Sequence, residues 1–322
     1  MTMKPLFLLI LALGMLASPW ANAGTFPDRP VTIVVPYPPG GAVDMVTRKM
    51  AAELQKQTGQ AFIVENKAGA TGTIGLLSVV HAPADGYTLV TNDTTFSLLP
   101  YIFKDLPFKP QSDLVPVAGF VFAPMAVAVK ANSRYKTLQD LLGAAKAAPG
   151  TITYGTGGRG SLPDFATEGM GMAAHARFMQ VPFKGAGEAT MALLTGTIDF
   201  QIASTPGLIG QLKGGSIRLL AVSGERRADT LPQVPTFAQA GLPGFGVVNF
   251  TGMWAPKGTP PAVIARLGNL VETAMHSPAM QAYAQSIGAA PGYWNGAALG
   301  RNVAQRTAYW GKVAANPDFE KR

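Results

Sequence analysis

The sequence VTIVVPYPPGGAVD, which spans Val31–Asp44, decides the fold. It begins with β-branched and apolar residues, Val31–Pro36, which are typical of a short strand buried in a sheet. The prolines and glycines that follow interrupt this strand. Apolar residues then recur at helical spacing through Ala42–Gln57, which predicts a helix. A strand, a glycine-rich turn and a helix in this order form the first half of a βαβ unit.

The same order of elements repeats along the chain. Strands are predicted at Phe62–Glu65 and Thr88–Thr91 around a helix at Thr73–His81, so strands recur about every 28 residues, as in a parallel sheet. A second series alternates in the same way. Its expected strands are Met125–Lys130, Thr151–Tyr154, Phe178–Phe183, Asp199–Ala203 and Ile217–Val222, and its helices are Leu138–Ala147, one starting near Leu162, and Glu188–Leu194.

The last part of the chain has a different pattern. An extended strand at Phe245–Trp254 is followed by three helices, at Ala262–His276, from Ser277 and from Asn295 to about Ala315. Three helices form too small a core to stand alone, so we expect them to pack against the first series.

The chain has 322 residues, enough for about two domains at roughly 150 residues each. We therefore predict an α/β fold of two lobes, each a sheet flanked by helices, with a hinge cleft between them. The first lobe is discontinuous, residues 24–125 plus 249–322, and the second is residues 126–248. The hinges are expected at the two crossovers, Ala123–Val127 and Gly246–Gly252.

The N-terminus has the three parts of a secretory signal, over Met1–Ala23. Lys4 supplies the charge, Leu6–Ala17 is apolar, and Ala21-Asn22-Ala23 supplies small residues before a cut at Gly24. The apolar run falls short of the roughly 20 residues of a membrane span. We expect an exported protein, with an uncleaved anchor as the alternative.

The composition excludes several classes of protein. There is no cysteine, so disulfides, thiolate metal sites and a cysteine nucleophile are ruled out. The three histidines, His81, His175 and His276, lack the spacing of a metal site, and we expect neither a metal nor a cofactor. The net charge is +8, without a dense Lys/Arg run, so we expect no nucleic-acid partner.

Three glycine-rich turns carry the functional signal, at residues 37–44, 66–72 and 155–161. Each follows an expected strand and precedes an expected helix. Ligands of open α/β sheets bind outside the carboxyl ends of the strands, and helix N-termini offer free N–H groups and a partial positive charge. Converging turns of this kind predict a site for a carboxylate or a phosphate. The alternative is that the glycines only make tight turns.

Two motif matches do not fit their families. Gly155–Gly160 satisfies G-x-G-x-x-G, but the next strand ends at Lys184 without the carboxylate that a dinucleotide ribose needs. Ser133–Lys136 matches S-x-x-K, but neither partner motif of the serine acyl enzymes follows. Since no nucleophile, triad or acid–base pair is recognisable, we expect a protein that is not an enzyme.

The charged residues in the turns have two interpretations. Asp44 either caps its helix or contacts a ligand amine or ordered waters. Arg159 and Lys184 either hold a ligand carboxylate or lie in solvent. Trp254 and Trp294 are expected to pack in the core rather than to stack on a ligand.

Nine motifs in order resemble one protein family over essentially the whole exported chain. That family is the substrate-binding proteins of tripartite tricarboxylate transporters, the Bug (Bordetella uptake gene) type. The motifs are RPV (29–31), VPYPPGGAVD (35–44), VENKAGATG (64–72), PADGYTL (83–89), VPFKG (181–185), LTGTID (194–199), LLAVS (219–223), LPQVPT (231–236) and APKGTP (255–260).

The resemblance implies a periplasmic binding protein of the type II fold that closes on a small carboxylate like a flytrap. It also implies delivery to the membrane permease subunits of a tripartite tricarboxylate transporter, by a receptor that is a monomer. Loop N–H groups and bridging waters would hold the carboxylate. With Arg159 added from the turn pattern, the expected ligand-binding residues are Pro39, Gly40, Gly41, Ala42, Asp44, Ala70, Thr71, Thr94, Thr95, Arg159, Ser161, Gly185, Ala186 and Asp199.

Two positions depart from the family pattern. Arg159 stands where no fixed residue type is expected, and Phe183 stands where a tyrosine is common, which removes a hydroxyl. Both concern the contacts to the distal part of the ligand. Two other functions stay open as alternatives, a ligand-sensing adaptor for a membrane signalling protein and an exported hydrolase.

Overall fold

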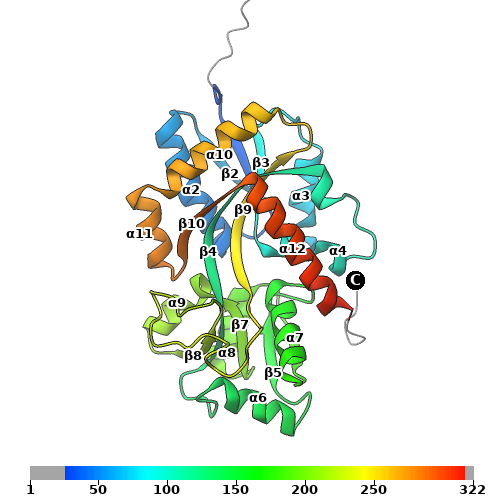
Figure 1. The fold of residues 1–322 in the computed structure, drawn as a ribbon, viewed down its shortest axis with the longest axis vertical. Coiled ribbons are helices and arrows are strands. Elements are labelled where there is room, and N and C mark those ends of the chain that lie inside the picture. The colour runs from blue at the N-terminus through cyan, green and yellow to red at the C-terminus, as the bar shows by residue number, and fades with distance from the viewer. Residues whose placement is uncertain (1–25, 316–322) are drawn as a thin grey trace, which may run out of the picture.

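The computed structural model describes residues 26–315. The predicted signal peptide at Met1–Ala23 lies outside the described residues. Figure 1 shows two halves, one above the other, each with a central sheet and helices around it. Among the described residues, no helix is long and apolar enough to cross a membrane.

The upper half is built on the βαβ units expected from the sequence. Its three parallel strands lie in the order β2-β1-β3, with Ile33 of β1 pairing with both Val64 and Leu89. The valines and the isoleucine of β1 are fully buried and Thr32 is half-buried, as expected for a central strand. The elements are β1 (Val31–Val35), α2 (Ala42–Thr58), β2 (Phe62–Asn66), η1 (Ala70–Gly72), α3 (Thr73–Val80), β3 (Thr88–Asn92), η2 (Thr94–Ser97), α4 (Leu99–Ile102) and α5 (Pro110–Asp113).

One long strand, β4 (Leu114–Lys130), runs through both halves. Up to Pro124 it pairs antiparallel with β9 (Val248–Pro256). From Met125 onward it pairs antiparallel with strands of the lower half instead. The sequence predicted only the part from Met125, because Pro116 and Pro124 interrupt the apolar pattern of the earlier part.

The lower half is a second sheet in the order β6-β5-β7-β4, with β8 also on β4. Its strands β5, β6 and β7 are parallel to one another. Helices cover both faces, as the alternating pattern predicted. The elements are α6 (Leu138–Ala147), β5 (Thr153–Thr156), α7 (Leu162–Ala174), β6 (Met179–Pro182), α8 (Ala186–Thr195), β7 (Phe200–Ser204), α9 (Thr205–Lys213) and β8 (Ile217–Val222).

The C-terminal segment packs back onto the upper half, as expected, but contains a strand that the sequence did not reveal. It comprises α10 (Pro261–Met275), α11 (Pro278–Ser286), β10 (Ala290–Asn295) and α12 (Gly296–Ala314). The extra strand, β10, pairs antiparallel with β4 through Trp294 and Gly119. Helix α12 then reaches the lower half, where Trp310 meets Phe165 of α7 with ring centroids 5.6 Å apart.

The buried apolar residues form three clusters. One lies between the upper sheet and the helices α2, α10 and α11. Another lies under α8 and α9 of the lower half. The largest continues across both halves along α12 and α7. It includes Trp254, which stacks on Phe96 at 4.4 Å, while Trp294 packs against Phe122 and Phe250, so both tryptophans pack as expected.

Candidate functional site

The topology directs the carboxyl ends of both sets of parallel strands to the junction of the halves. In the upper half, β3 is antiparallel to β9 and β9 to β4, so β1, β2 and β3 run with β4 toward the lower half. In the lower half, β7 is antiparallel to β4, so β5, β6 and β7 run back toward the upper half. The loops after these strands therefore lie where ligands of α/β sheets bind.

The 37–44 turn presents an open helix N-terminus. Gly40 has a φ of 81°, a left-handed conformation that favours glycine. Gly41 is the N-cap of α2, and no side chain caps the helix. The first N–H groups of α2, from Ala42 onward, are therefore available to an anion. Pro39, Gly40 and Gly41 are exposed, and Ala42 is half-buried.

Asp44 lies buried beneath this turn and holds it in shape. Its Oδ2 accepts hydrogen bonds from the Gly40 N–H at 2.8 Å and from Arg48 Nε at 3.0 Å, and its Oδ1 accepts one from Asn66 Nδ2 at 2.8 Å. Burial acts to raise the pKa of Asp44, but these donors outweigh it and lower the pKa below its ordinary value. Both carboxylate oxygens are thus used within the protein, which favours a structural role in the turn over contact with a ligand amine or ordered waters.

The 66–72 turn has left-handed backbone φ angles at four consecutive residues. Gly69, Ala70, Thr71 and Gly72 all have positive φ, with 45° at Ala70 and 54° at Thr71. Non-glycine residues rarely adopt this conformation, and such strain gathers at functional sites. The turn is exposed at Ala70 and half-buried at Thr71.

Close packing at the bases of the 66–72 turn and the 37–44 turn holds the two together. A Cβ added to Gly75 would lie 2.9 Å from the Cα of Pro36, so only glycine fits at this contact. The Lys67 N–H also donates to the carbonyl of Val35 at 2.9 Å. Asn66 Nδ2 also donates to the carbonyl of Tyr37 at 3.0 Å and to Asp44 Oδ1 at 2.8 Å, so the two glycine-rich turns of the upper half lie side by side.

A polar network follows β3 and adds a third turn, residues 92–97. The Tyr37 hydroxyl lies 2.7 Å from Asn92 Oδ1 and 3.0 Å from Asp93 Oδ1. Burial, together with the Asp93 charge, raises the pKa of Tyr37 well above its ordinary value, so the phenol stays protonated and donates. The Nδ2 of Asn92 is buried and has no hydrogen-bond partner among the described residues.

The return strand β9 contributes to the same network. Asn249 Oδ1 accepts a hydrogen bond from the Thr94 N–H at 3.1 Å, and Asp93 Oδ1 accepts one from the Thr95 N–H at 2.9 Å. Thr94 and Thr95 are nearly fully buried. The backbone N–H groups of both are occupied, and Thr94 also donates its hydroxyl to the carbonyl of Val248 at 3.3 Å. Thr94 and Thr95 thus shape the turn.

In the lower half, the 155–161 turn lies beside the turn at residues 183–188. A Cβ on Gly157 would contact the backbone of Gly185 and Ala186 at 3.5 Å. Gly185 is the N-cap of α8 and Ser161 is the N-cap of α7, and neither helix has a side-chain cap. Ser161 Oγ is buried without a partner among the described residues. Two further helix N-termini therefore offer free donors here.

A buried carboxylate also supports the 155–161 turn. Asp164 Oδ2 accepts a hydrogen bond from the Gly160 N–H at 2.8 Å, and its Oδ1 lies 2.9 Å from the Tyr154 hydroxyl. Burial raises the pKa of Asp164 to about 6. The exposed Arg159 lies near enough for its charge to lower that pKa in part. Asp164 thus plays in the lower half the part that Asp44 plays in the upper half.

One residue expected at the site, Asp199, lies elsewhere. It precedes β7, at the amino end of the strand, whereas the junction is at the carboxyl end of β7, about 17 Å away at the usual rise per residue. Its Oδ2 accepts hydrogen bonds from the N–H and the hydroxyl of Thr153 at 2.9 and 2.8 Å. Asp199 therefore fastens the start of β5 to β7, and the structure does not bring it together with the turns.

Sequence reasoning missed several polar residues of the site. Asn92 ends β3 and Asp93 follows it, which is a usable signal, and Asn249 is the lone amide in β9, a strand that is apolar apart from Thr251. Ser204 at the carboxyl end of β7 is the uncapped N-cap of α9, a further open helix end near the junction. Among residues 26–315, no group of three or more His, Cys, Asp or Glu is placed to hold a metal ion.

Comparisons with known proteins agree with this geometry. The family described as the tripartite tricarboxylate transporter family receptor matches residues 46–317. Protein BugT of Bordetella pertussis is 33% identical over 289 residues, which cover 88% of this chain and 87% of BugT.

Solved structures of the same fold include two with dicarboxylates. The periplasmic binding protein BugD superposes with a TM-score of 0.84 at 30% identity, over 92% of this chain and all of BugD. Rpa4515 of R. palustris with adipate has a TM-score of 0.85 at 31% identity, over 90% of this chain and 97% of Rpa4515. MatC of Rhodopseudomonas palustris with bound malate has a TM-score of 0.82 at 29% identity, over 90% of this chain and all of MatC.

Proposed function

The chain belongs to the tripartite tricarboxylate transporter receptor family, and from this premise we propose that it captures a small carboxylate between its two halves. The family consists of periplasmic solute-binding receptors and not of enzymes. The observation that carries the proposal is a pair of unused buried polar atoms, Asn92 Nδ2 in the upper half and Ser161 Oγ in the lower half. Buried polar atoms ordinarily have partners, so two atoms without one, each in a turn at the junction, favour a bound ligand.

Open helix ends supply the complementary charge. Helices α2, α7 and α8 all begin at the junction without a side-chain cap. Each end offers free N–H groups and about half a positive charge, which suits a carboxylate. Neutral donors of this kind are held rigid by Asp44 and Asp164, so they need no reorganisation when the ligand arrives.

Backbone recognition explains how capture and release coexist. A buried arginine would bind a carboxylate more strongly, but its desolvation is costly. Backbone N–H groups that are buried only when the halves close stay hydrated in the open state. They therefore carry no desolvation cost until the ligand is bound. Closure around the ligand then brings Ser161 to the anion, and the exposed Arg159 and Lys184 lie on the lower wall for the distal end of the ligand.

Malate and adipate in the two family structures favour a dicarboxylate of four to six carbons. The 66–72 turn and the 37–44 turn would hold one carboxylate. The turns of the lower half would contact the rest of the ligand and so determine which ligand is bound. Phe183, the first residue of the 183–188 turn, is half-buried against the cluster under α8 and α9, and its exposed part would contact the intervening carbons.

The two halves would act as lobes with the bounds expected from the sequence, residues 24–125 plus 249–322 and residues 126–248. The switch of β4 partners between Pro124 and Met125 and the start of β9 at Val248 support these bounds. We expect the receptor to be an exported, cleaved monomer that delivers its ligand to the permease subunits of a tripartite tricarboxylate transporter.

A thermal-shift screen of the exported protein tests this function. The library contains malate, succinate, adipate, citrate, glutamate, nicotinate and benzoate, each beside its neutral amide. A ligand at a hundredfold excess over Kd stabilises the fold by about 2.7 kcal/mol, a shift that is readily measured. At least one acid should raise the Tm while its amide does not. If no acid raises the Tm, mass spectrometry of the denatured protein must reveal a co-purified carboxylate, or the proposal is wrong.

A further inference from the structure

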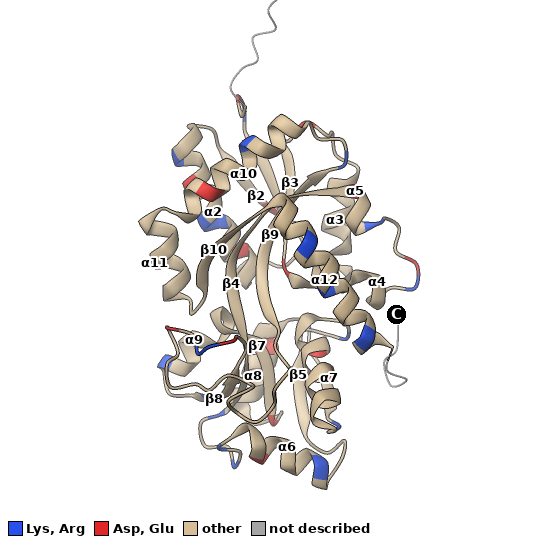
Figure 2. Ribbon diagram, viewed as in Figure 1, with Lys and Arg blue, Asp and Glu red and all other residues tan. Residues whose placement is uncertain are grey.

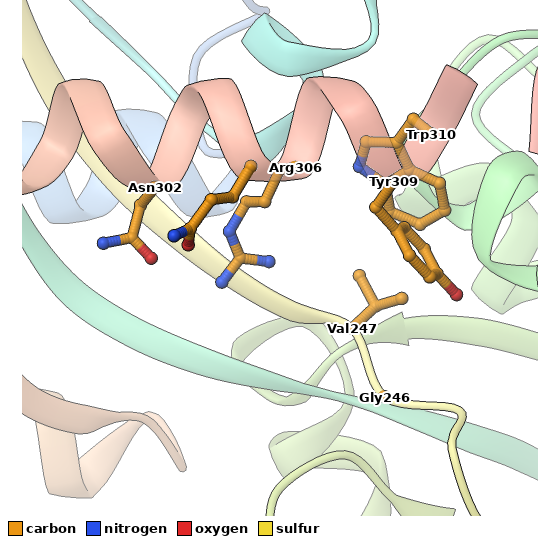
Figure 3. A pocket seen from close by; sticks show the side chains of 7 residues that line it. Gly246, Val247, Asn302, Arg306, Tyr309 and Trp310 are labelled. Atoms are coloured by element: carbon orange, nitrogen blue, oxygen red, sulfur yellow. The ribbon is translucent and has the colours of Figure 1, made fainter. Parts of the chain in front are cut away.

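A second cavity lies between α12 and the segment that leads into β9. Its volume is about 240 Å³, enough for a small organic anion or a few waters. It is formed by seven residues, and five of them come from α12: Asn302, Gln305, Arg306, Tyr309 and Trp310 (Figure 3). The remaining two are Gly246 and Val247.

This cavity lies on the opposite face of β9 from the network of the candidate site. Asn249 and Phe250 are neighbours in β9, so their side chains point to opposite faces of the sheet. Asn249 bonds the Thr94 N–H beside the turns, whereas Phe250 lies under the guanidinium of Arg306 at 5.5 Å. The cavity shares no residue with the glycine-rich turns.

Two hydrogen-bond donors of the cavity are unused. Arg306 Nε and Trp310 Nε1 are both buried without a partner among the described residues. They stand four residues apart on α12, on one face of the helix. In Figure 3 the indole nitrogen of Trp310 lies on the edge of the ring toward Arg306. It is unusual for two buried donors in one cavity to lack a hydrogen-bond partner, because buried donors normally have one.

The cavity also carries a positive charge, on the half-buried Arg306. Burial lowers the pKa of Arg306 from its ordinary value, and no ion pair of Arg306 occurs among residues 26–315. None of the seven lining residues is acidic. Helix α12 carries Arg301, Arg306 and Lys312 and no Asp or Glu, as its blue bands in Figure 2 show. A cation held in this way attracts an anion.

We propose that this cavity is a second binding site, for a small oxyanion such as phosphate, sulfate or a short carboxylate. The guanidinium of Arg306 and the indole N–H of Trp310 would donate to its oxygens, and the amides of Asn302 and Gln305 would complete the shell. Because Gly246 and Val247 lead into β9, the anion contacts the segment by which the chain returns to the upper half. The proposal is independent of the ligand held by the glycine-rich turns.

Inorganic phosphate is the probe, and three variants of the exported protein are compared with the wild type. Arg306→Met removes the charge, Trp310→Phe removes the N–H and keeps an aromatic ring, and Arg301→Gln is the matched control. Arg301 is exposed on the same helix. Sodium chloride at equal ionic strength corrects for the general effect of salt on stability.

Phosphate should raise the Tm of the wild type and of Arg301→Gln with a saturating dependence on concentration. The rise should disappear in Arg306→Met and reach half-saturation at several-fold higher phosphate in Trp310→Phe. Without phosphate, Arg306→Met should unfold no lower than the wild type, because a half-buried cation without an ion pair among the described residues is removed. Ser161→Ala should leave the phosphate response unchanged, which separates this cavity from the turns.

Two results would overturn the proposal. One is an equal saturating response in Arg306→Met and the wild type. The other is a large loss of Tm in Arg306→Met without phosphate, which would assign Arg306 a purely structural role.

Discussion

Asp44 Oδ1 accepts a hydrogen bond from Asn66 Nδ2 at 2.8 Å, across 22 residues of sequence. The same amide donates to the carbonyl of Tyr37 at 3.0 Å. Through these two bonds, the end of β2 fixes the turn after β1. The open N-terminus of α2 is thereby held in place before any ligand is present.

Removing the charge of Asp44 tests this relationship. Asp44→Asn keeps the shape but offers one acceptor oxygen to three donors, so we expect a loss of about 2–3 kcal/mol in the free energy of unfolding at pH 7. The folded-state pKa of Asp44 is lowered, so its contribution is present above the unfolded pKa and is lost as the pH falls through the folded pKa. Urea unfolding at pH 7 and pH 3 should show the difference between wild type and variant shrinking at pH 3. A difference that is equal at both pH values would assign the effect to something other than the charge.

Ser161→Ala separates binding from stability. Since Ser161 Oγ has no partner within the described protein, its loss should leave the Tm unchanged or slightly higher. The affinity for the carboxylate ligand should fall several-fold, measured by calorimetric titration. Ser286→Ala is the control, because Ser286 Oγ bonds only the carbonyl of Tyr283 in its own helix. Equal affinities in both variants would remove Ser161 from the site.

Gly185→Ala places a methyl group at the N-terminus of α8, where Gly185 is the N-cap. Nothing lies within 4 Å of the added Cβ, and the backbone of Gly185 is extended, so the fold should tolerate it. The methyl group should obstruct the free N–H groups and lower ligand affinity about tenfold or more. Gly143→Ala in α6 also has open space and should instead raise stability by about 0.5–1 kcal/mol without an effect on binding. An unchanged affinity in Gly185→Ala would exclude this helix end from the site.

The titration of Asp164 should change the stability of the fold with pH in the direction opposite to that of Asp44. Burial raises its pKa to about 6 in the folded state, above its ordinary value of 3.8. Between these values the unfolded chain binds fewer protons than the folded chain, so the stability from Asp164 falls as pH rises from about 4 to about 6. Relative to Asp164→Asn, which does not titrate, the wild type should lose up to about 3 kcal/mol over this interval. Denaturant unfolding at several pH values measures it, and parallel curves for the two proteins would contradict it.

The sequence predicted the repeated elements and the family, because buried parallel strands and glycine-rich turns leave local patterns. It missed helix α9, and it missed two strand segments, the first part of β4 and all of β10. Both contain proline or glycine and are kept in the sheet by pairing with distant strands, which no local pattern records.

The candidate site was predicted in its backbone and only partly in its side chains. Glycine-rich turns are visible because their residue types are required locally. Asn249 reaches the site only because β9 returns beside β3, so its role depends on tertiary contact. Asp199 ends the family motif at residues 194–199, but the direction of β7 places it at the end of the sheet away from the turns.

Calorimetric titration of the ligand-free exported protein tests the central claim most directly. Malate, succinate and adipate are each titrated beside their diamides at pH 7. We expect that at least one dicarboxylate binds with a stoichiometry of one and that its diamide gives no binding heat. Two results would contradict capture of a carboxylate. One is a diamide that binds as tightly as its acid, and the other is the absence of binding heat for every dicarboxylate with protein shown to be ligand-free.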